Sequence, residues 1–311
     1  MKPFEEWPKE ELVKELRRVV NEQDRVQYYG ALSLPRKGEF PRLPGIDYFA
    51  IVEPYGGCVG GDYLAIIDFS KYQLGKRIKK AGKTGNDALA ATLAKNLDRF
   101  GIAIGDVSGH GIAESVIVNF LHGSFRALVR AQIKQYGEVT SEFIEELNQE
   151  LYEHVKAEYL KKRPYATFLY GEVHNDGRFR YVTSGHPSPI IFSIEHNRIE
   201  KIDKERTQAS TPLGVFPSRY HVDAQAFVHS VDKVPVNEVH LLMPGDIMLL
   251  YTDGLTEQRG GELNFAEERL EDVLRGVKGE PARTVHDTIK RELFDFCPPD
   301  DDLTIAVIKK K

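Results

Sequence analysis

Four aspartates stand where an apolar, strand-like segment meets a turn. They are Asp62 in VGGDY, Asp106 in GIAIGDVSGHG, Asp253 in LLYTDGLTE and Asp301 in PDDDLTIAV. Aspartate is a common turn residue, so each one taken alone is also explained as part of an ordinary turn. Carboxylates at the ends of central strands can meet at one edge of a β-core, however, and they repel one another unless a cation neutralises them. The set therefore indicates a metal centre.

The ligand type indicates which metal this centre would hold. Mg²⁺ and Mn²⁺ prefer carboxylate, carbonyl and water oxygens. Glycines beside Asp62 and Asp106 would let backbone and ligand approach closely. Two such ions, about 3.5–4 Å apart, can bind a bridging water, lower its pKa and stabilise an in-line displacement at phosphorus. Mn²⁺ or Mg²⁺ is therefore the expected ion, and a pair of such ions could support hydrolysis of a phosphate ester.

Histidines and cysteines are the other residues in the sequence that could take part in catalysis. His110 or His186 could protonate the leaving group, a contribution of roughly 10²–10⁴-fold. His110, between two glycines, could equally cap the following helix, and His186 in SGHP could organise a turn. The only cysteines are Cys58 and Cys297, and neither lies in a phosphate-cradling loop, so a cysteine nucleophile is disfavoured. They also form no zinc pattern and no disulfide framework.

The elements that must position these residues come in blocks. Apolar periodicity predicts helices from Ile112 to Gln135, Ser141 to Leu160, Phe265 to Arg275 and Pro281 to Phe294. Shorter apolar runs predict strands over 48–52, 63–69, 100–104, 166–173, 179–183, 189–194, 199–202, 239–243, 247–251 and 303–308. The turn sequences NDG, EHN and PGD suggest hairpins, the last of them joining 239–243 to 247–251. The order predicts an α+β fold with a mainly antiparallel β-core and paired helices outside.

Two segments extend this core. Residues 1–45 contain an amphipathic helix, from Pro8 to about Tyr29, and a proline-rich linker; the catalytic domain would be 46–311. The helix could pack on the domain or pair with a second chain. An insertion at 70–99 starts basic and continues as a short helix rich in alanine and leucine. Its cations would attract an acidic or phosphorylated partner, although a solvated loop explains them equally well. These cations are Lys71, Lys76, Arg77, Lys79, Lys80 and Lys83.

Composition narrows the class of protein. The 311 residues are 41% hydrophobic and 29% charged, as in an ordinary globular protein. Lys and Arg number 42 against 47 Asp and Glu, a formal charge of −5 that gives no basis for nucleic-acid binding. No apolar run approaches the roughly 20 residues of a membrane span. The acidic start MKPFEEWPKEE is unlike a signal peptide. We expect a cytoplasmic protein.

Five motifs occur in the order of a known family: VGGD, GDVSGHG, YATFLYGEV…FRYVTSGHPSPIIF, LLMPGDIMLLYTDGLTE and DDLTIAV. From about Tyr48 to Ile308 the chain resembles the metal-dependent protein phosphatases of type 2C, in the bacterial branch of the SpoIIE and RsbU regulators. The resemblance implies a four-layer αββα sandwich with two metals between the sheets. It assigns Asp62, Asp106 and the Val107 carbonyl to one part of the metal site, and Asp253 and Asp301 to the second metal. Asp300 and Asp302 match the family's ligand pattern less well.

The resemblance also implies the reaction. It points to a serine/threonine protein phosphatase in which Asp62, Asp106 and Asp253 act through a metal-bound water, without a covalent phosphoenzyme and with His110 as a candidate acid. The implied substrate is a phosphorylated anti-anti-sigma (STAS-type) protein of a partner-switching pathway. Relatives often join an upstream sensor through a dimerising helix. Only about 45 residues precede the core, so regulation would come through this helix or a separate partner.

Two departures from the family keep alternatives open. GGDYLAIID has Ala65 where an acidic residue is usual, although Asp68 follows closely. No arginine corresponds to the one with which eukaryotic relatives hold phosphate. A catalytically weak regulator that binds a phosphoprotein is one alternative, and a hydrolase of small phosphate esters is another.

Overall fold

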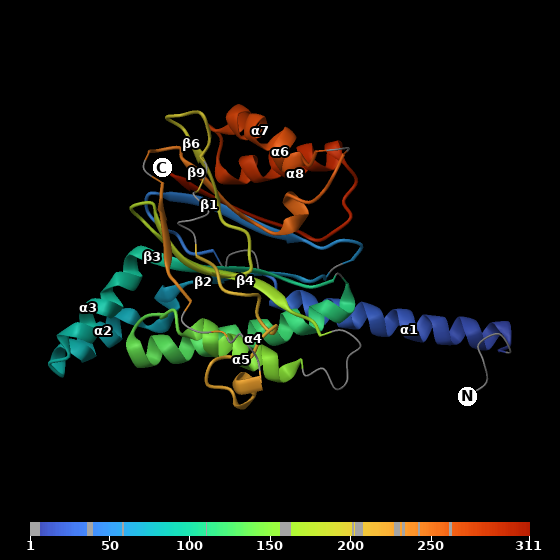
Figure 1. The fold of residues 1–311 in the computed structure, drawn as a ribbon, viewed down its shortest axis with the longest axis horizontal. Coiled ribbons are helices and arrows are strands. Elements are labelled where there is room, and N and C mark those ends of the chain that lie inside the picture. Colours follow the sequence, from blue (N-terminus) through green and yellow to red (C-terminus); the bar gives the residue numbers. More distant parts are fainter. Residues whose placement is uncertain are drawn as a thin grey trace.

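The chain folds into two stacked β-sheets with helices on both outer faces (Figure 1). The computed structural model describes residues 7–35, 40–57, 59–109, 111–155, 163–200, 202, 208–226, 231, 234–241, 243–260 and 263–311. Each sheet has five strands in the described residues, and every pair of neighbouring strands is antiparallel. The predicted α+β, αββα sandwich is confirmed.

The first sheet unites the two ends of the core sequence. Its strands, in spatial order, are β1 (Ile46–Glu53), β10 (Leu303–Lys310), β9 (Ile247–Tyr251), β6 (Ile190–Ser193) and β7 (Arg198–Glu200). The second sheet contains, in order, β2 (Asp62–Ile67), β3 (Arg99–Val107), β4 (Ala166–His174), β5 (Arg178–Ser184) and β8 (Asn237–His240). The β1–β10 pairing therefore closes the fold only after the last residues are in place.

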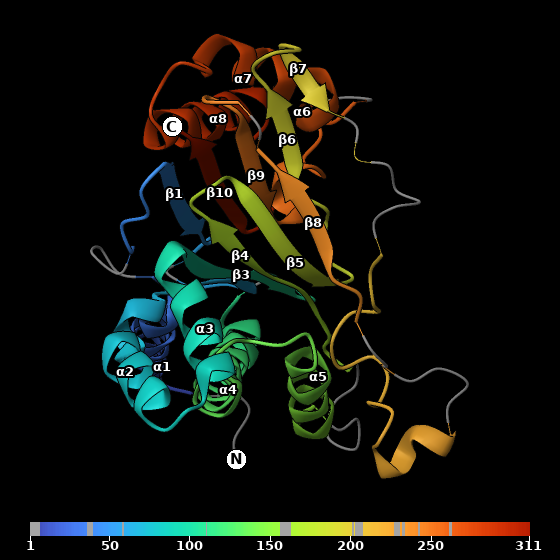
Figure 2. The same ribbon diagram turned by 90° about the vertical axis from the view of Figure 1, so that its left-hand side faces the viewer.

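Helices bury the outer face of each sheet (Figures 1 and 2). The second sheet is covered by α4 (Ile112–Tyr136) and α5 (Phe143–His154). The first sheet is covered by α6 (Phe265–Glu268), α7 (Leu270–Val277) and α8 (Ala282–Phe296). The helix α4 is also long and apolar enough to cross a bilayer by length and composition alone, which the sequence had not suggested. In the structure its apolar side belongs to the core, where Val118, Leu121, Phe125, Val129 and Ile133 are buried.

The strand β2 shows why the central strands are apolar throughout. All six of its residues are buried, yet they serve two different cores. Tyr63, Ala65 and Ile67 pack with the helices, whereas Leu64 and Ile66 pack against the other sheet. Successive side chains in a strand point to opposite faces, so a strand inside a sandwich needs apolar residues at every position.

The expected hairpin between 239–243 and 247–251 is wrong. β8 pairs with β5 in the second sheet, whereas β9 pairs with β10 and β6 in the first. The PGD turn, with Gly245 at φ +95°, therefore carries the chain from one sheet to the other. Asp246 stabilises the turn, because its carboxylate accepts hydrogen bonds from the backbone N–H groups of Ile194 (2.9 Å) and Met243 (2.8 Å). Alternating apolar residues predict a strand but not its neighbours.

The insertion forms a helical hairpin of α2 (Leu74–Lys83) and α3 (Asp87–Lys95), so its basic part is helical rather than a loop. Leu74 and Leu93 are buried in the core under α4. Arg77 Nη2 donates to the carbonyl of Ile133 (2.6 Å), and Asn96 Nδ2 donates to that of Gly137 (2.7 Å). The Asn96 bond satisfies the carbonyl just past the C-terminal end of α4, and the Arg77 bond gives a second donor to the Ile133 carbonyl, which also accepts the Gly137 N–H at 3.1 Å.

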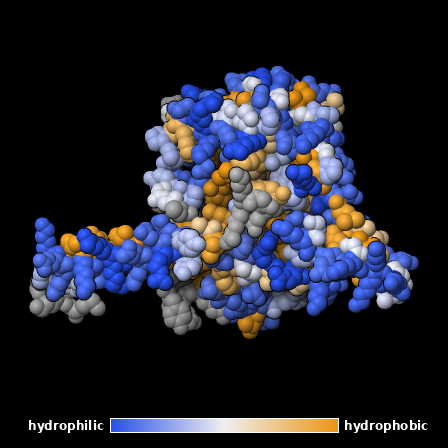
Figure 3. All heavy atoms as spheres, turned by 180° about the vertical axis from the view of Figure 1, so that it is seen from behind, coloured by the Kyte–Doolittle hydropathy of each residue, from blue (hydrophilic) through white to orange (hydrophobic). Residues whose placement is uncertain are grey.

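The predicted N-terminal helix is confirmed as α1 (Lys9–Gly30), and it projects away from the sandwich (Figure 1). Among its described residues only Gly30 is buried. A Cβ there would lie 2.8 Å from Val59 Cγ1, which shows how closely the end of the helix meets the domain. Six apolar side chains further out are 36–63% exposed, and apolar atoms follow the projecting helix in Figure 3. They belong to Leu12, Val13, Leu16, Val19, Val20 and Val26.

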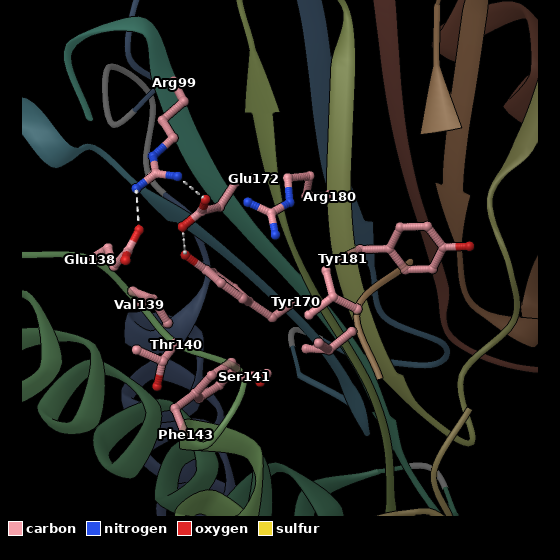
Figure 4. Close-up of a pocket in the computed structure, with 12 residues that line it drawn as sticks. Arg99, Glu138, Val139, Thr140, Ser141, Phe143, Tyr170, Glu172, Arg180 and Tyr181 are labelled. Atoms are coloured by element: carbon pink, nitrogen blue, oxygen red, sulfur yellow. Dashed lines mark hydrogen bonds and ion pairs between the residues drawn. The ribbon is translucent and has the colours of Figure 1, made fainter. Parts of the chain in front are cut away.

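A buried polar network anchors the start of β3 (Figure 4). Arg99 Nη1 donates to Glu172, whose other oxygen accepts a hydrogen bond from the Tyr170 hydroxyl at 3.2 Å. Arg99 Nε also donates to Asn96 Oδ1 (3.1 Å) at the end of the insertion. Burial raises the pKa of Glu172, and Arg99 opposes that shift. The network lines a cavity of about 220 Å³, but its charged groups satisfy one another and need no ligand.

Replacing Phe125 should show how strongly the packing of α4 on the sheet stabilises the fold. Its ring is fully buried and lies 5.6 Å from that of Phe168 and 5.7 Å from that of Tyr170. Phe125→Ala should lower the free energy of unfolding by about 3–5 kcal/mol, because it leaves a cavity. Urea denaturation measures this. Val116→Ala, at a 55% exposed position of the same helix, should change it by no more than about 0.5 kcal/mol. Equal losses in the two variants would contradict this packing.

Candidate metal centre

The sheet topology brings the four predicted aspartates to one end of the sandwich. Asp62 begins β2 and Asp106 lies near the end of β3, and the two are directly paired in the antiparallel register. Asp253 follows β9 and Asp301 precedes β10, which are also antiparallel neighbours. One pair therefore comes from each sheet. Asp62 thus shares this end of the sandwich with residues as distant in the chain as Thr252, which lies 190 positions away.

Asp62 is buried and joins the two sheets. Its Oδ2 accepts hydrogen bonds from the hydroxyls of Thr252 (2.8 Å) and Thr304 (2.6 Å), both from the opposite sheet. The Thr252 hydroxyl in turn accepts a hydrogen bond from the backbone N–H of Thr304 (3.0 Å). Burial and the nearby Asp106 raise the pKa of Asp62, and the threonine bonds partly offset this. Sequence reasoning missed the role of both threonines, although each stands within three residues of a predicted ligand.

The remaining acids repel one another. Burial raises the pKa of Asp106 to about 8, and Asp253 and Asp301 add to that shift. Burial also raises the pKa of Asp253 to about 6, with further contributions from Asp301 and Glu257. Carboxylates in this position must hold a proton or face a cation. Glu257 is exposed and was not predicted; its only signal is its place four residues after Asp253.

This acidic set fits hard divalent cations by its chemistry. All its side-chain donors are oxygen atoms, and their mutual repulsion would be relieved by Mg²⁺ or Mn²⁺. A cavity of about 180 Å³ opens beside Asp253, Glu257 and Asp301. Within the described part of the chain, however, no three His, Cys, Asp or Glu side chains form a closed set of ligands. The carboxylates would therefore have to move closer together around an ion.

Asp302 is engaged by the backbone. Its carboxylate accepts hydrogen bonds from the N–H groups of Tyr55 and Gly61, each at 2.6 Å, and so holds the loop between β1 and β2. Glycine is required in this loop, since a Cβ on Gly60 would collide with the same carboxylate, and one on Gly61 would lie 2.6 Å from the Val107 carbonyl oxygen. The Val107 carbonyl, a predicted ligand, thus lies beside the loop that leads to Asp62.

The structure also tests the two candidate histidines and the Ala65 position. His110 lies outside the described residues. His186 is buried, its Nδ1 is 2.9 Å from the Thr167 hydroxyl, and burial lowers its pKa to about 3, so it does not suit a general acid at neutral pH. Ala65 faces the helix core, not the acids. Asp68 does not replace the missing acid, because it lies beyond the far end of β2, about 20 Å from Asp62 at ~3.3 Å per residue.

Comparison with known proteins identifies the family. The model of the family "Stage II sporulation protein E (SpoIIE)" matches residues 96–311, more than half of the chain. The match includes Asp106, Asp253 and Asp301 but begins after Asp62.

Solved structures share the fold. The SiaA-PP2C domain of Pseudomonas aeruginosa has a TM-score of 0.64 at 17% identity, over 96% of this chain and 99% of that one. The RsbU and RsbW domains of Rv1364c from Mycobacterium tuberculosis give 0.60 at 21% identity, over 87% of this chain and 61% of that one. The SpoIIE phosphatase domain with a regulatory fragment, from Bacillus subtilis, gives 0.54 at 15%, over 86% and 64%. The chain thus spans less than two thirds of the last two.

The fold, the acidic end of the sandwich and the family match agree. The chain belongs to the SpoIIE family, and it shares the fold of PP2C phosphatase domains.

Proposed function

We propose that this protein is a cytoplasmic, metal-dependent serine/threonine protein phosphatase that hydrolyses phosphoserine or phosphothreonine. The observation that carries the proposal is the convergence of Asp62, Asp106, Asp253 and Asp301 at one end of the sandwich. Burial raises the pKa of Asp106 to about 8, and the negative charges of Asp253 and Asp301 add to that shift. Because buried carboxylates that repel one another destabilise the fold, such a cluster is best explained as a cation-binding site.

Asp62, Asp106, the Val107 carbonyl, Asp253 and Asp301 would hold two ions, Mn²⁺ or Mg²⁺. When bound, such ions supply Lewis acidity and lower the pKa of a water between them. The protein itself contributes the placement of the ligands. Asp62 cannot rotate freely, because two threonine hydroxyls hold one of its oxygens.

Cys297, the cysteine that the structure describes, does not suit the role of a catalytic nucleophile. Cys297 is buried, and burial raises the pKa of its thiol, so little thiolate forms at neutral pH.

The case for a catalytically weak regulator is also reduced, since Ala65 packs in the helix core and takes no part in the acidic site. A preference for phosphoproteins over free phosphate esters would separate a protein phosphatase from a small-molecule hydrolase.

The proposed substrate is a phosphorylated STAS-type anti-anti-sigma protein. Support comes from the family and from the similar Mycobacterium tuberculosis structure, which contains RsbU and RsbW domains. Partner switching of this kind would make the phosphatase one of several proteins that compete for the same regulator.

Asp253→Asn tests the metal centre directly. Asparagine keeps the size of the side chain but removes the charge, so metal-dependent hydrolysis of a phosphoserine protein should fall at least about a hundredfold. Turnover should be measured with Mn²⁺, with Mg²⁺ and with chelator. Asp300→Asn is the matched control, because Asp300 lines the same cavity but is not assigned as a ligand. If Asp253→Asn kept full activity, or if chelator had no effect, the metal-centre proposal would fail.

Thr304→Val tests the support given to Asp62. Valine has a similar shape but cannot donate the 2.6 Å hydrogen bond, so the Mn²⁺ concentration needed for half-maximal activity should rise roughly 10–100-fold. Thr304→Ser retains the hydroxyl and should stay near the parent value. Identical metal titrations for the valine and serine variants would show that this bond does not position the ligand.

The exposed face of α1 is proposed as a homodimer contact. Leu12, Leu16, Val19 and Val26 recur at alternating four- and three-residue spacing with Gln23 between them, the pattern of a coiled-coil seam with one polar position. Leu16→Glu should convert a dimer into a monomer in sedimentation equilibrium. Lys14→Glu, away from the seam, should leave the dimer intact. A parent protein that is monomeric at tens of micromolar would refute this contact.

A further inference from the structure

We propose a second ligand site, a basic pocket at the root of the insertion that binds the phosphate group of a small molecule. The pocket has a volume of about 380 Å³ and lies between the end of β2, the turn that follows it and the middle of α4. It is lined by Ile66, Asp68, Lys71, Tyr72, Arg126 and Arg130.

The pocket is separate from the acidic centre. Asp62 lies at one end of β2, and the pocket lies at the other end, where its Asp68 is about 20 Å from Asp62 at ~3.3 Å per residue. Its charge is also opposite, since three cations face a single carboxylate. An anion repelled by the metal-free acids would be attracted here.

The cations of the pocket lack anionic partners within the protein. No Asp or Glu oxygen of the described residues lies within the 4.0 Å of an ion pair with Lys71, Arg126 or Arg130. Asp68 is partly engaged, because its Oδ1 accepts hydrogen bonds from the backbone N–H and the hydroxyl of Ser70, at 3.0 and 2.5 Å. The positive charge therefore exceeds what the lining can neutralise.

The two arginines are placed for a phosphate. Arg126 and Arg130 are four residues apart on α4 and so lie on the same face, where like charges repel unless an anion lies between them. Arg126 is half-buried, and its Nη1 donates to the Ile66 carbonyl at 3.0 Å, which fixes the guanidinium before any ligand arrives. Guanidinium groups match phosphate oxygens in pairs of hydrogen bonds.

The remaining lining suggests an attached organic group. Tyr72 offers a ring and a hydroxyl that stays protonated, because burial raises its pKa, and Ile66 adds an apolar wall. The volume exceeds what a single phosphate ion needs. We infer a phosphate ester of a small molecule, with inorganic phosphate sharing the same charged contacts.

Calorimetric titration of the full chain in metal-free buffer tests the site without engaging the metal centre. Inorganic phosphate and a nucleoside diphosphate serve as probes. We expect one saturable site that Arg130→Gln weakens about tenfold, as loss of one charge-assisted hydrogen bond would. Arg126→Gln should act similarly, and Lys79→Gln, on the exposed side of α2 outside the pocket, should have less than about a twofold effect. Tighter binding of the nucleotide would support an organic ester as the ligand, and equal binding would support free phosphate.

Two results would overturn the proposal. One is the absence of saturable binding of either probe up to about 10 mM. The other is an equal loss in Arg130→Gln and Lys79→Gln, which would mean general attraction to a basic surface. Because no metal is present, failure here would leave the phosphatase proposal standing, and failure of the Asp253→Asn test would leave this one standing.

Discussion

The two sheets of this protein are joined at their functional end by a buried carboxylate. Asp62 lies at the start of one sheet and accepts hydrogen bonds from two threonines of the other. The same end collects Asp106, Asp253 and Asp301; burial raises the pKa values of Asp106 and Asp253, and the charge of Asp301 raises both further. The rest of the fold must hold this repulsive group together, and three layers of apolar packing do so. The acidic cluster therefore lowers the stability of the fold while it forms the candidate functional site, as is common at sites that bind charge.

The second sheet separates opposite charges along its length. Its acidic end holds the candidate metal centre, whereas the other end meets the basic root of the insertion. Helix α4 runs between these regions: it begins just after the GDVSGHG loop, and its later turns carry Arg126 and Arg130. Buried packing along α4 makes it a stiff connection between the two. A ligand at the basic pocket would therefore contact the same helix that starts at the metal-binding loop.

Much of the architecture was predictable because its signals are local. Helical periodicity predicted α1, α4, α5 and α8, and turn sequences predicted the β4–β5 and β6–β7 hairpins. The same reasoning failed for β8 and β9. Two apolar runs joined by PGD have the same sequence pattern whether the strands pair with each other or belong to different sheets. It also failed for the basic half of the insertion, where burial of Leu74 and bonds to the end of α4 accompany a helix that charge alone does not suggest.

By itself, the sequence determined the fold class, the family and the four aspartates as a candidate set, because apolar periodicity and short motifs are written in neighbouring residues. Only the tertiary structure decided what surrounds them. Thr304 bonds to Asp62 across 242 positions, and Asp302 is held by the backbone of a loop equally distant in the chain. Such partners carry no local signal, since hydrogen bonds and charge repulsion depend on distance in space, which only the packing of the two sheets sets.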